Sequence, residues 1–362
     1  MTLNESGQTV TNHVLMVDTF LDNTTLSPDI GYNDLINLRN RMNQIQYFIC
    51  PSLFFIGLTG NICTLLTVSR SQFRHLTSRY ILCALAVSDS LLLCTNPFNQ
   101  NFMKDLWNRD IRVLSTFGCK LYFVMYRVGK MSASWFIVLV AVERFLAVMF
   151  PLKAKLVLQK KTIAASIAVV YIFMVSFSSI WTFSTRIVNG ICRPDSVTID
   201  NRKLHKSFVI IGAGLYSLIP ILLLLTMTPP IIVKLLRRHQ QRRQMLHSAI
   251  SQSARETSRI TIMLIGIVIA YIIWVTPITV VLIMTFWNNQ PIFGASNYGM
   301  VVFQTVALTF EQLNHSSNFF IYVMCSRQFR KRFLIMVGCG SLVRKDTIHA
   351  SSSSVTTGFN KD

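Results

Sequence analysis

An arginine next to a glutamate stands at one end of an apolar stretch of this chain, in the run Ala141-Val142-Glu143-Arg144-Phe145. A guanidinium is costly to hold beside lipid, so a charge at such a place is kept for a function. A charge pair there suits a protein whose helices move around it. The run therefore favours a receptor over a channel or an enzyme.

A second charged group lies inside the apolar stretches themselves. Arg127 and Lys130 are three residues apart, so on a helix they share one face, and Glu311 is an acid in another stretch. Because a lone buried charge is expensive, we expect Glu311 to pair with one of the two bases, of which Lys130 is the deeper. A purely structural ion pair explains only one cation. The second cation is left to meet a carboxylate or an amide carbonyl of a ligand.

Seven membrane-length stretches position these residues. Of the 362 residues, 51% are hydrophobic and 14% are charged, which is too apolar for a soluble protein of several domains. About 20 apolar residues cross a bilayer, and backbone groups in lipid must be satisfied internally, so each stretch predicts a helix. We predict an all-α membrane protein with a seven-transmembrane helix bundle over residues 46–325. The stretches are 47–68, 80–98, 121–142, 162–183, 207–233, 260–287 and 296–325.

The basic residues predict how the bundle is oriented. The loops and tail on one side carry twice as many Lys and Arg residues as those on the other side. By the positive-inside rule the first side is cytoplasmic, and the N-terminus is extracellular. The net charge of +20 is then a signal of topology, and without a soluble basic domain nucleic-acid binding has little weight. We predict a multi-pass protein of the plasma membrane.

Polar segments flank the bundle. Residues 1–45 lack an apolar leader and predict an extracellular tail, in which Asn4 and Asn23 begin glycosylation triplets. Residues 326–338 predict a short amphipathic helix on the membrane surface. Residues 339–362 predict a disordered cytoplasmic tail, whose serine-rich run is a candidate for phosphorylation.

The eight cysteines do not form the framework of a small disulfide-rich protein, and several lie within helices as small apolar packing residues. Cys119 opens the third helix and Cys192 lies in the second outer loop, both on the oxidising side, so we expect them to form a disulfide. Cys339 follows the amphipathic stretch. It is either a palmitoylation site or a free thiol.

Short motifs recur along the predicted helices. They are Gly60-Asn61 in helix one, Leu85-Ala86-Val87-Ser88-Asp89 in helix two, Cys119 and Glu143-Arg144-Phe145 at the two ends of helix three, Pro220 in helix five, Pro277 in helix six, and Asn318-Phe319-Phe320-Ile321-Tyr322 in helix seven. In this order and spacing, over residues 45–340, they resemble class A (rhodopsin-like) G-protein-coupled receptors. The resemblance implies a heterotrimeric G protein as partner. It gives Glu143, Arg144, Phe145 and Tyr322 a role in coupling.

The chain departs from the family's pattern at several positions. Phe319 replaces the proline of helix seven, and Val275 replaces the aromatic residue two positions before Pro277, with Trp274 displaced by one. Thr228 stands where a tyrosine is usual. We therefore expect the activation geometry to differ in detail from that of the family.

The resemblance also implies a cation site. Asp89 in the middle of helix two, with Asn314 and Asn318 four residues apart on one face of helix seven, resembles the family's sodium pocket. Ala133 stands where the family often has a serine, so one ligand is missing. The alternatives are a bound sodium ion and a water-filled polar network without an ion. No other cofactor is expected.

The family's ligands bind at the depth of Arg127 and Lys130. The candidate ligand-binding residues are Tyr126, Arg127, Lys130, Gln304 and Glu311. Amine receptors carry an aspartate where this chain has Tyr126, and opsins need a helix-seven lysine that residues 296–325 lack. Biogenic amines and retinal are therefore disfavoured as ligands.

Three runs resemble neuropeptide receptors of the invertebrate FMRFamide-receptor type, namely residues 142–148, 150–153 and 317–322. We predict a receptor for an extracellular neuropeptide that activates heterotrimeric G proteins, with arrestin and receptor kinases as further partners. One alternative is a class A receptor for a small anionic or lipid ligand, and another is a transporter or channel. The sequence has no HExxH, GxSxG or P-loop motif, so we do not expect an enzyme.

Overall fold

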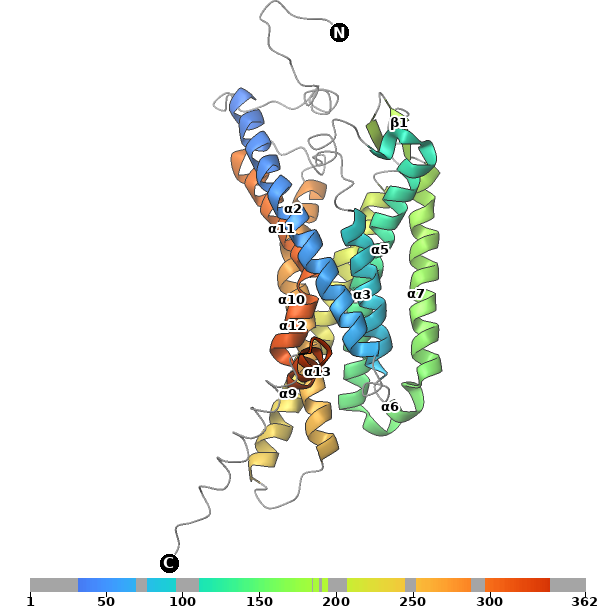
Figure 1. Cartoon of the computed structure of the whole chain (residues 1–362), viewed down its shortest axis with the longest axis vertical. Coiled ribbons are helices and arrows are strands. Elements are labelled where there is room, and N and C mark those ends of the chain that lie inside the picture. The colour runs from blue at the N-terminus through green and yellow to red at the C-terminus, as the bar shows by residue number, and fades with distance from the viewer. Residues whose placement is uncertain are drawn as a thin grey trace, which may run out of the picture.

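The structure is a computed structural model that describes residues 32–69, 77–95, 111–183, 185–188, 191–194, 207–244, 252–287 and 297–338. Apart from one short hairpin, the regular elements in these ranges are helical. The long helices run side by side along the long axis of the molecule (Figure 1). They are α2 (Tyr32–Ser69), α3 (Ser78–Thr95), α5 (Thr116–Met149), α7 (Lys160–Ile180), α9 (Ile219–Gln244), α10 (Gln252–Trp287) and α11 (Tyr298–Ser316).

Six helices in the described part of the chain are long and apolar enough to cross a membrane, judged by length and composition. The fifth of these is the span Ser207–Arg238, in which a π-helical turn at Gly214–Leu218 precedes α9. The seventh stretch predicted from the sequence is occupied by α11, continued by α12 (Asn318–Cys325). The predicted all-α membrane bundle is confirmed.

Short elements close the two ends of the bundle. At one end a 3-10 turn (Trp181–Phe183) leads into strands β1 (Thr185–Val188) and β2 (Ile191–Pro194), which pair antiparallel. At the opposite end lie α6 (Pro151–Val157) and α13 (Arg327–Met336), as Figure 1 shows. A second 3-10 turn, Ile111–Leu114, precedes α5. We call these the hairpin end and the α13 end.

Both ends of α5, which carries several candidate residues, are fixed by hydrogen bonds. At its start the Ser115 hydroxyl accepts a hydrogen bond from the Gly118 N–H at 2.9 Å, as an N-cap does. At its C-terminus, Lys234 and Arg238 of α9 donate to the carbonyls of Met149 and Val148, both at 3.2 Å. Cations there satisfy the last carbonyls and oppose the helix dipole.

Helix seven is interrupted at Ser317 although it lacks the expected proline. The Ser316 hydroxyl donates to the Gln312 carbonyl at 3.1 Å. Such back-bonding by a serine competes with the backbone ladder and bends helices. The break between α11 and α12 falls where two serines, Ser316 and Ser317, follow each other.

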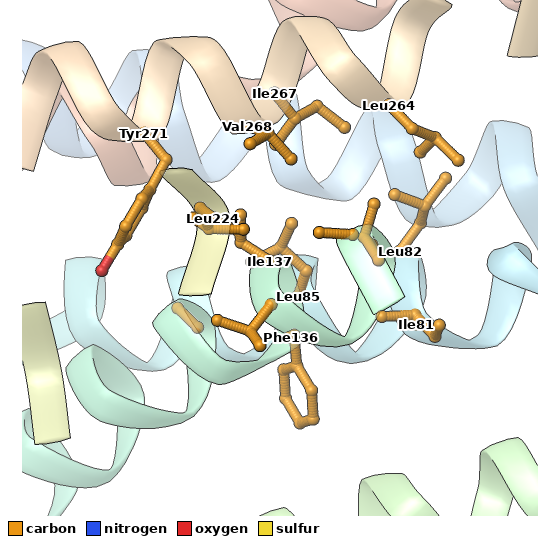
Figure 2. Packing of buried hydrophobic residues seen from close by; sticks show 14 of the residues in the cluster. Ile81, Leu82, Leu85, Phe136, Ile137, Leu224, Leu264, Ile267, Val268 and Tyr271 are labelled. Atoms are coloured by element: carbon orange, nitrogen blue, oxygen red, sulfur yellow. The ribbon is translucent and has the colours of Figure 1, made fainter. Parts of the chain in front are cut away.

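Apolar side chains from four helices meet in the centre of the bundle. Figure 2 shows Leu85 of α3, Phe136 and Ile137 of α5, Leu224 of α9 and Leu264 of α10, all essentially inaccessible. The outer faces are also apolar: Phe48 and Phe55 of α2 are 71% and 66% exposed. Large apolar side chains on both faces suit a helix between protein and lipid.

Glycine allows a close approach of α3 and α5. A Cβ atom at Gly129 would lie 2.8 Å from the backbone nitrogen of Leu92, closer than real Cβ atoms come. A side chain at this position would force the two backbones apart. Gly129 therefore keeps the middle of α5 against the turn of α3 that follows Asp89.

Candidate functional site

A cavity of about 200 Å³ lies among α5, α7, the segment before α9, α10 and α11. Its walls are largely apolar and aromatic, with a few charged or polar groups, as is usual for ligand pockets. All five sequence-predicted ligand residues line it, and they are Tyr126, Arg127, Lys130, Gln304 and Glu311. The structure thus brings together residues that are up to 185 positions apart in the chain.

Glu311 pairs with Lys130, the deeper of the two bases that the sequence offered. The Lys130 Nζ and a Glu311 carboxylate oxygen form an ion pair, and the Glu311 residue is only 5% exposed. The same Nζ lies 4.1 Å from the centre of the Tyr216 ring, a cation–π contact. The pair therefore links α5 to α11 and leaves this part of the cavity formally neutral.

Arg127 lies one turn closer to the hairpin end and makes a different set of contacts. Its guanidinium carbon is 3.7 Å from the centre of the Trp181 ring and 5.2 Å from that of Phe123. Its Nη1 atom is buried and has no hydrogen-bond partner among the described residues. Because aromatic rings pack against the guanidinium plane, the N–H groups at its edge can bind a planar acceptor such as a carboxylate or an amide.

A disulfide fixes the hairpin beside this cavity. Cys119, in the first turn of α5, is bonded to Cys192 of β2, and their Cα atoms are 5.7 Å apart. Both residues are buried, and Cys192 pairs with Ile187 across the hairpin. The disulfide expected from the sequence is therefore present. It ties the segment after Trp181 to the helix that carries Arg127.

At the α13 end, Arg144 and Glu143 are buried together with the first residues of α3. The Arg144 Nη2 donates to Glu143 Oε1 at 2.8 Å and to the Ser78 hydroxyl at 2.7 Å. The same carboxylate oxygen accepts from Ser78 Oγ at 2.8 Å and from Thr77 Oγ1 at 2.6 Å. Arg144 is 6% exposed and Glu143 0%. This Arg144 cluster holds α5 against α3 and covers the guanidinium.

The other two predicted coupling residues do not join the Arg144 cluster. Phe145 packs against a separate apolar group, the residues Val148, Ile231 and Ile265. Tyr322 is buried against Phe329 of α13, with ring centres 5.4 Å apart. The four residues therefore lie in three different environments, and their common role in coupling stays a prediction.

Asp89 lies at a second buried polar cluster, and here the sequence prediction needs correction. Its carboxylate accepts from Asn318 Nδ2 at 2.7 Å, as expected. Its other oxygen lies 2.7 Å from Nδ1 of His315, a residue that the sequence analysis did not select. Asn314 makes no such contact, and its Nδ2 has no hydrogen-bond partner among the described residues. His315 precedes Asn318 by three positions, so helical spacing could have found it.

Three further predicted residues fall outside the described part of the chain. They are the glycosylation candidates Asn4 and Asn23 and the lipidation candidate Cys339. The sequence expectations for them remain predictions.

Comparison with known proteins gives one family over most of the chain. The family described as "7 transmembrane receptor (rhodopsin family)" matches residues 60–326. A blue-sensitive opsin of Anolis carolinensis is 26% identical over 304 residues, which cover 81% of this chain and 80% of the opsin. Shorter matches include the growth hormone secretagogue receptor type 1 of Sus scrofa (31% over 34% of this chain and 32% of that receptor) and the C-C chemokine receptor type 8 of Mus musculus (33% over 39% and 37%).

Proposed function

The chain belongs to the rhodopsin family of seven-transmembrane receptors, and from this membership we propose that it is a plasma-membrane receptor for an extracellular neuropeptide. Membership makes the chain a G-protein-coupled receptor and not an enzyme. Beyond this membership we propose the class of ligand, the orientation in the membrane, and the residues that recognise the ligand and couple to the G protein.

Arg127 is the observation that carries the proposal. The Lys130–Glu311 ion pair is neutral by itself, whereas Arg127 adds a buried positive charge whose Nη1 lacks a hydrogen-bond partner among the described residues. A peptide offers both a carboxylate and many amide carbonyls to such a group. We assign to Arg127 the recognition of a carboxylate or carbonyl of the ligand.

The size of the cavity supports a ligand that enters only in part. About 200 Å³ is smaller than the roughly 300–1,000 Å³ of typical drug-sized pockets. One terminal residue of a peptide suits this space, and the rest of the peptide would lie toward the hairpin end. The likeness to a receptor named for a C-C chemokine favours a polypeptide ligand as well. The runs 142–148 and 317–322 point further, to ligands of the FMRFamide type.

A small anionic or lipid ligand is the second candidate, because Arg127 would bind its charge equally well. Retinal is not a candidate despite the likeness to opsins, since α11 and α12 contain no lysine that could form a Schiff base.

In the proposed mechanism the hairpin end is extracellular and the α13 end is cytoplasmic. A ligand bound beside Arg127 favours one of two arrangements of the helices, the one in which α5 and α3 separate at the Arg144 cluster. Arg144, released from Glu143 and Ser78, then contacts the G protein. Receptor kinases and arrestin would act on the tail after activation.

A library screen tests the ligand class. Cells that express the full chain are exposed to neuropeptides, each with a free and an amidated C-terminus, and to a set of small anions and lysophospholipids. Dissociation of the G-protein heterotrimer is the readout, and Arg144→Ala at matched surface level is the non-coupling control. We expect a peptide to activate wild type and not the control. Activation by anions or lipids alone would overturn the peptide assignment.

A further inference from the structure

The cation site that the family resemblance implies does not fit a sodium ion in this chain. A hard cation takes oxygen ligands, and the Asp89 carboxylate would be the charged ligand among them. Both of its oxygens already face nitrogen atoms, Nδ1 of His315 and Nδ2 of Asn318, each at 2.7 Å. An ionised Asp89 carboxylate only accepts, so with that form the contact takes the His315 tautomer that carries its proton on Nδ1.

The neighbouring hydroxyl groups are also engaged. Ser132 Oγ of α5 donates to the Val128 carbonyl at 2.6 Å and lies 2.8 Å from Ser88 Oγ, which in turn lies 2.8 Å from the Tyr171 hydroxyl of α7. Ala133, where the family often has a serine, supplies no oxygen. An ion would have to displace two N–H donors from Asp89 and find its remaining ligands among groups that are already paired.

We propose that His315 replaces the cation: its ring N–H is the permanent partner of Asp89, and this receptor does not bind sodium there. Asp89, His315 and Asn318 are at most 3% exposed, so the arrangement is closed to solvent. The side chain belongs to the protein, so the contact does not depend on the concentration of an ion. The inference does not depend on the identity of the ligand.

The position of His315 gives the contact a mechanical consequence. His315 is in the last turn of α11 and Asn318 is the first residue of α12, so the two lie on either side of the break at Ser317. One Asp89 carboxylate of α3 thereby holds both halves of helix seven. Where a receptor with a bound ion can release it on activation, this chain must break a hydrogen bond within the protein.

Thermal unfolding of the purified full-length receptor tests the proposal with sodium itself as the probe. Tryptophan fluorescence gives Tm in a titration with sodium chloride, with choline chloride keeping the ionic strength constant. A ligand that binds only the folded state raises Tm in a concentration-dependent way. We expect wild type to show no saturable rise. We expect His315→Ser, which frees one oxygen of Asp89 and adds a hydroxyl, to gain a saturable rise of a few degrees.

Two controls separate the site from general effects of salt. Asp89→Asn in the His315→Ser background should abolish the gained response, and His239→Ser, the same change at the far end of α9, should behave as wild type. A saturable rise in wild type that Asp89→Asn removes would overturn the proposal without recourse to any His315 variant. A His315→Ser receptor that folds and shows no sodium response would overturn it as well. If that variant does not fold, His315→Ala replaces it under the same criteria.

Discussion

Two ion pairs stand on α5, one at its middle and one near its C-terminal end, and they are built differently. Lys130 and Glu311 come from separate helices and carry the contact between α5 and α11 themselves. Glu143 and Arg144 are neighbours in the chain, and their contact with α3 runs through the hydroxyls of Thr77 and Ser78. Breaking the first pair leaves a charge buried between helices. Separation of α3 from α5 at the second pair removes the hydroxyl contacts, and in the proposed mechanism Arg144 also leaves Glu143.

The disulfide also distinguishes the hairpin end of the bundle from the α13 end. Cys119 and Cys192 cross-link the hairpin end, whereas among the described residues the α13 end is joined by hydrogen bonds, the ion pair and apolar contacts. We infer that the hairpin end keeps a fixed shape for recognition and that the α13 end is the part that rearranges. The predictions below test this division, from the largest expected effect to the smallest.

Lys130→Ala should have the largest effect, on folding. It strands the Glu311 carboxylate in the interior, and removal of one partner of a buried pair costs about 3–5 kcal/mol. Surface expression, measured by antibody binding to an N-terminal tag, should fall severely. Lys130→Met with Glu311→Gln removes both charges and should restore expression, while Lys155→Ala on the exposed face of α6 should match wild type. Equal losses in the single and double variants would show that the ion pair is not the cause.

Cys119→Ala should come next. Loss of a native disulfide costs about 2–5 kcal/mol in small secreted domains, and here it frees the hairpin from α5. We expect lower surface expression and a lower Tm for the material that does reach the surface. Cys325→Ala, which removes an exposed free thiol, is the matched control. Unchanged Tm in Cys119→Ala would contradict the view that the hairpin end depends on its cross-link.

Arg127→Ala should reduce the potency of the agonist and leave surface expression close to wild type. If the guanidinium meets a desolvated carboxylate, its loss costs about 2–5 kcal/mol, or roughly 30-fold or more in affinity. Arg127→Lys keeps the charge without the planar edge, so its potency should fall between the two. Dose–response curves of G-protein activation measure this. Equal potency in all three receptors would mean that Arg127 merely covers Trp181.

Much of the architecture was predictable because it follows from composition. Seven apolar stretches dictate seven helices, and Cys119 and Cys192 could be paired because both lie on the predicted oxidising side. Residue depth along a helix was enough to select Lys130 as the partner of Glu311. Each of these inferences needs only local geometry.

What was missed depends on how helices turn and pack. The family pattern points to Asn314 and not to His315, although the three-residue spacing from Asn318 places His315 on the same helix face. The sequence, with Phe319 in place of the proline, also gives no sign that helix seven is interrupted at Ser317. Such features arise from competition between side chains and backbone, which a motif does not record.

The smallest expected effect belongs to Ser78→Ala, which tests the hydroxyl contact between α3 and the Glu143–Arg144 pair. Ser78 Oγ accepts from Arg144 and donates to Glu143, so the change removes two hydrogen bonds between α3 and α5 and leaves the ion pair intact. A typical hydrogen bond contributes about 0.5–1.5 kcal/mol net. The two bonds together contribute about 1–3 kcal/mol, so the open arrangement should gain population by roughly 5- to 150-fold, and basal G-protein activation should rise without ligand.

Ser52→Ala, the same change on an exposed face of α2, is the control for Ser78→Ala, and all signals are normalised to surface level. Basal activity that stays at the wild-type value in Ser78→Ala would show that α3 and α5 do not separate at this point. In that case the contact of Ser78 with the ion pair is structural. The moving part must then be sought on the other side of α5, where Phe145 packs with α9 and α10.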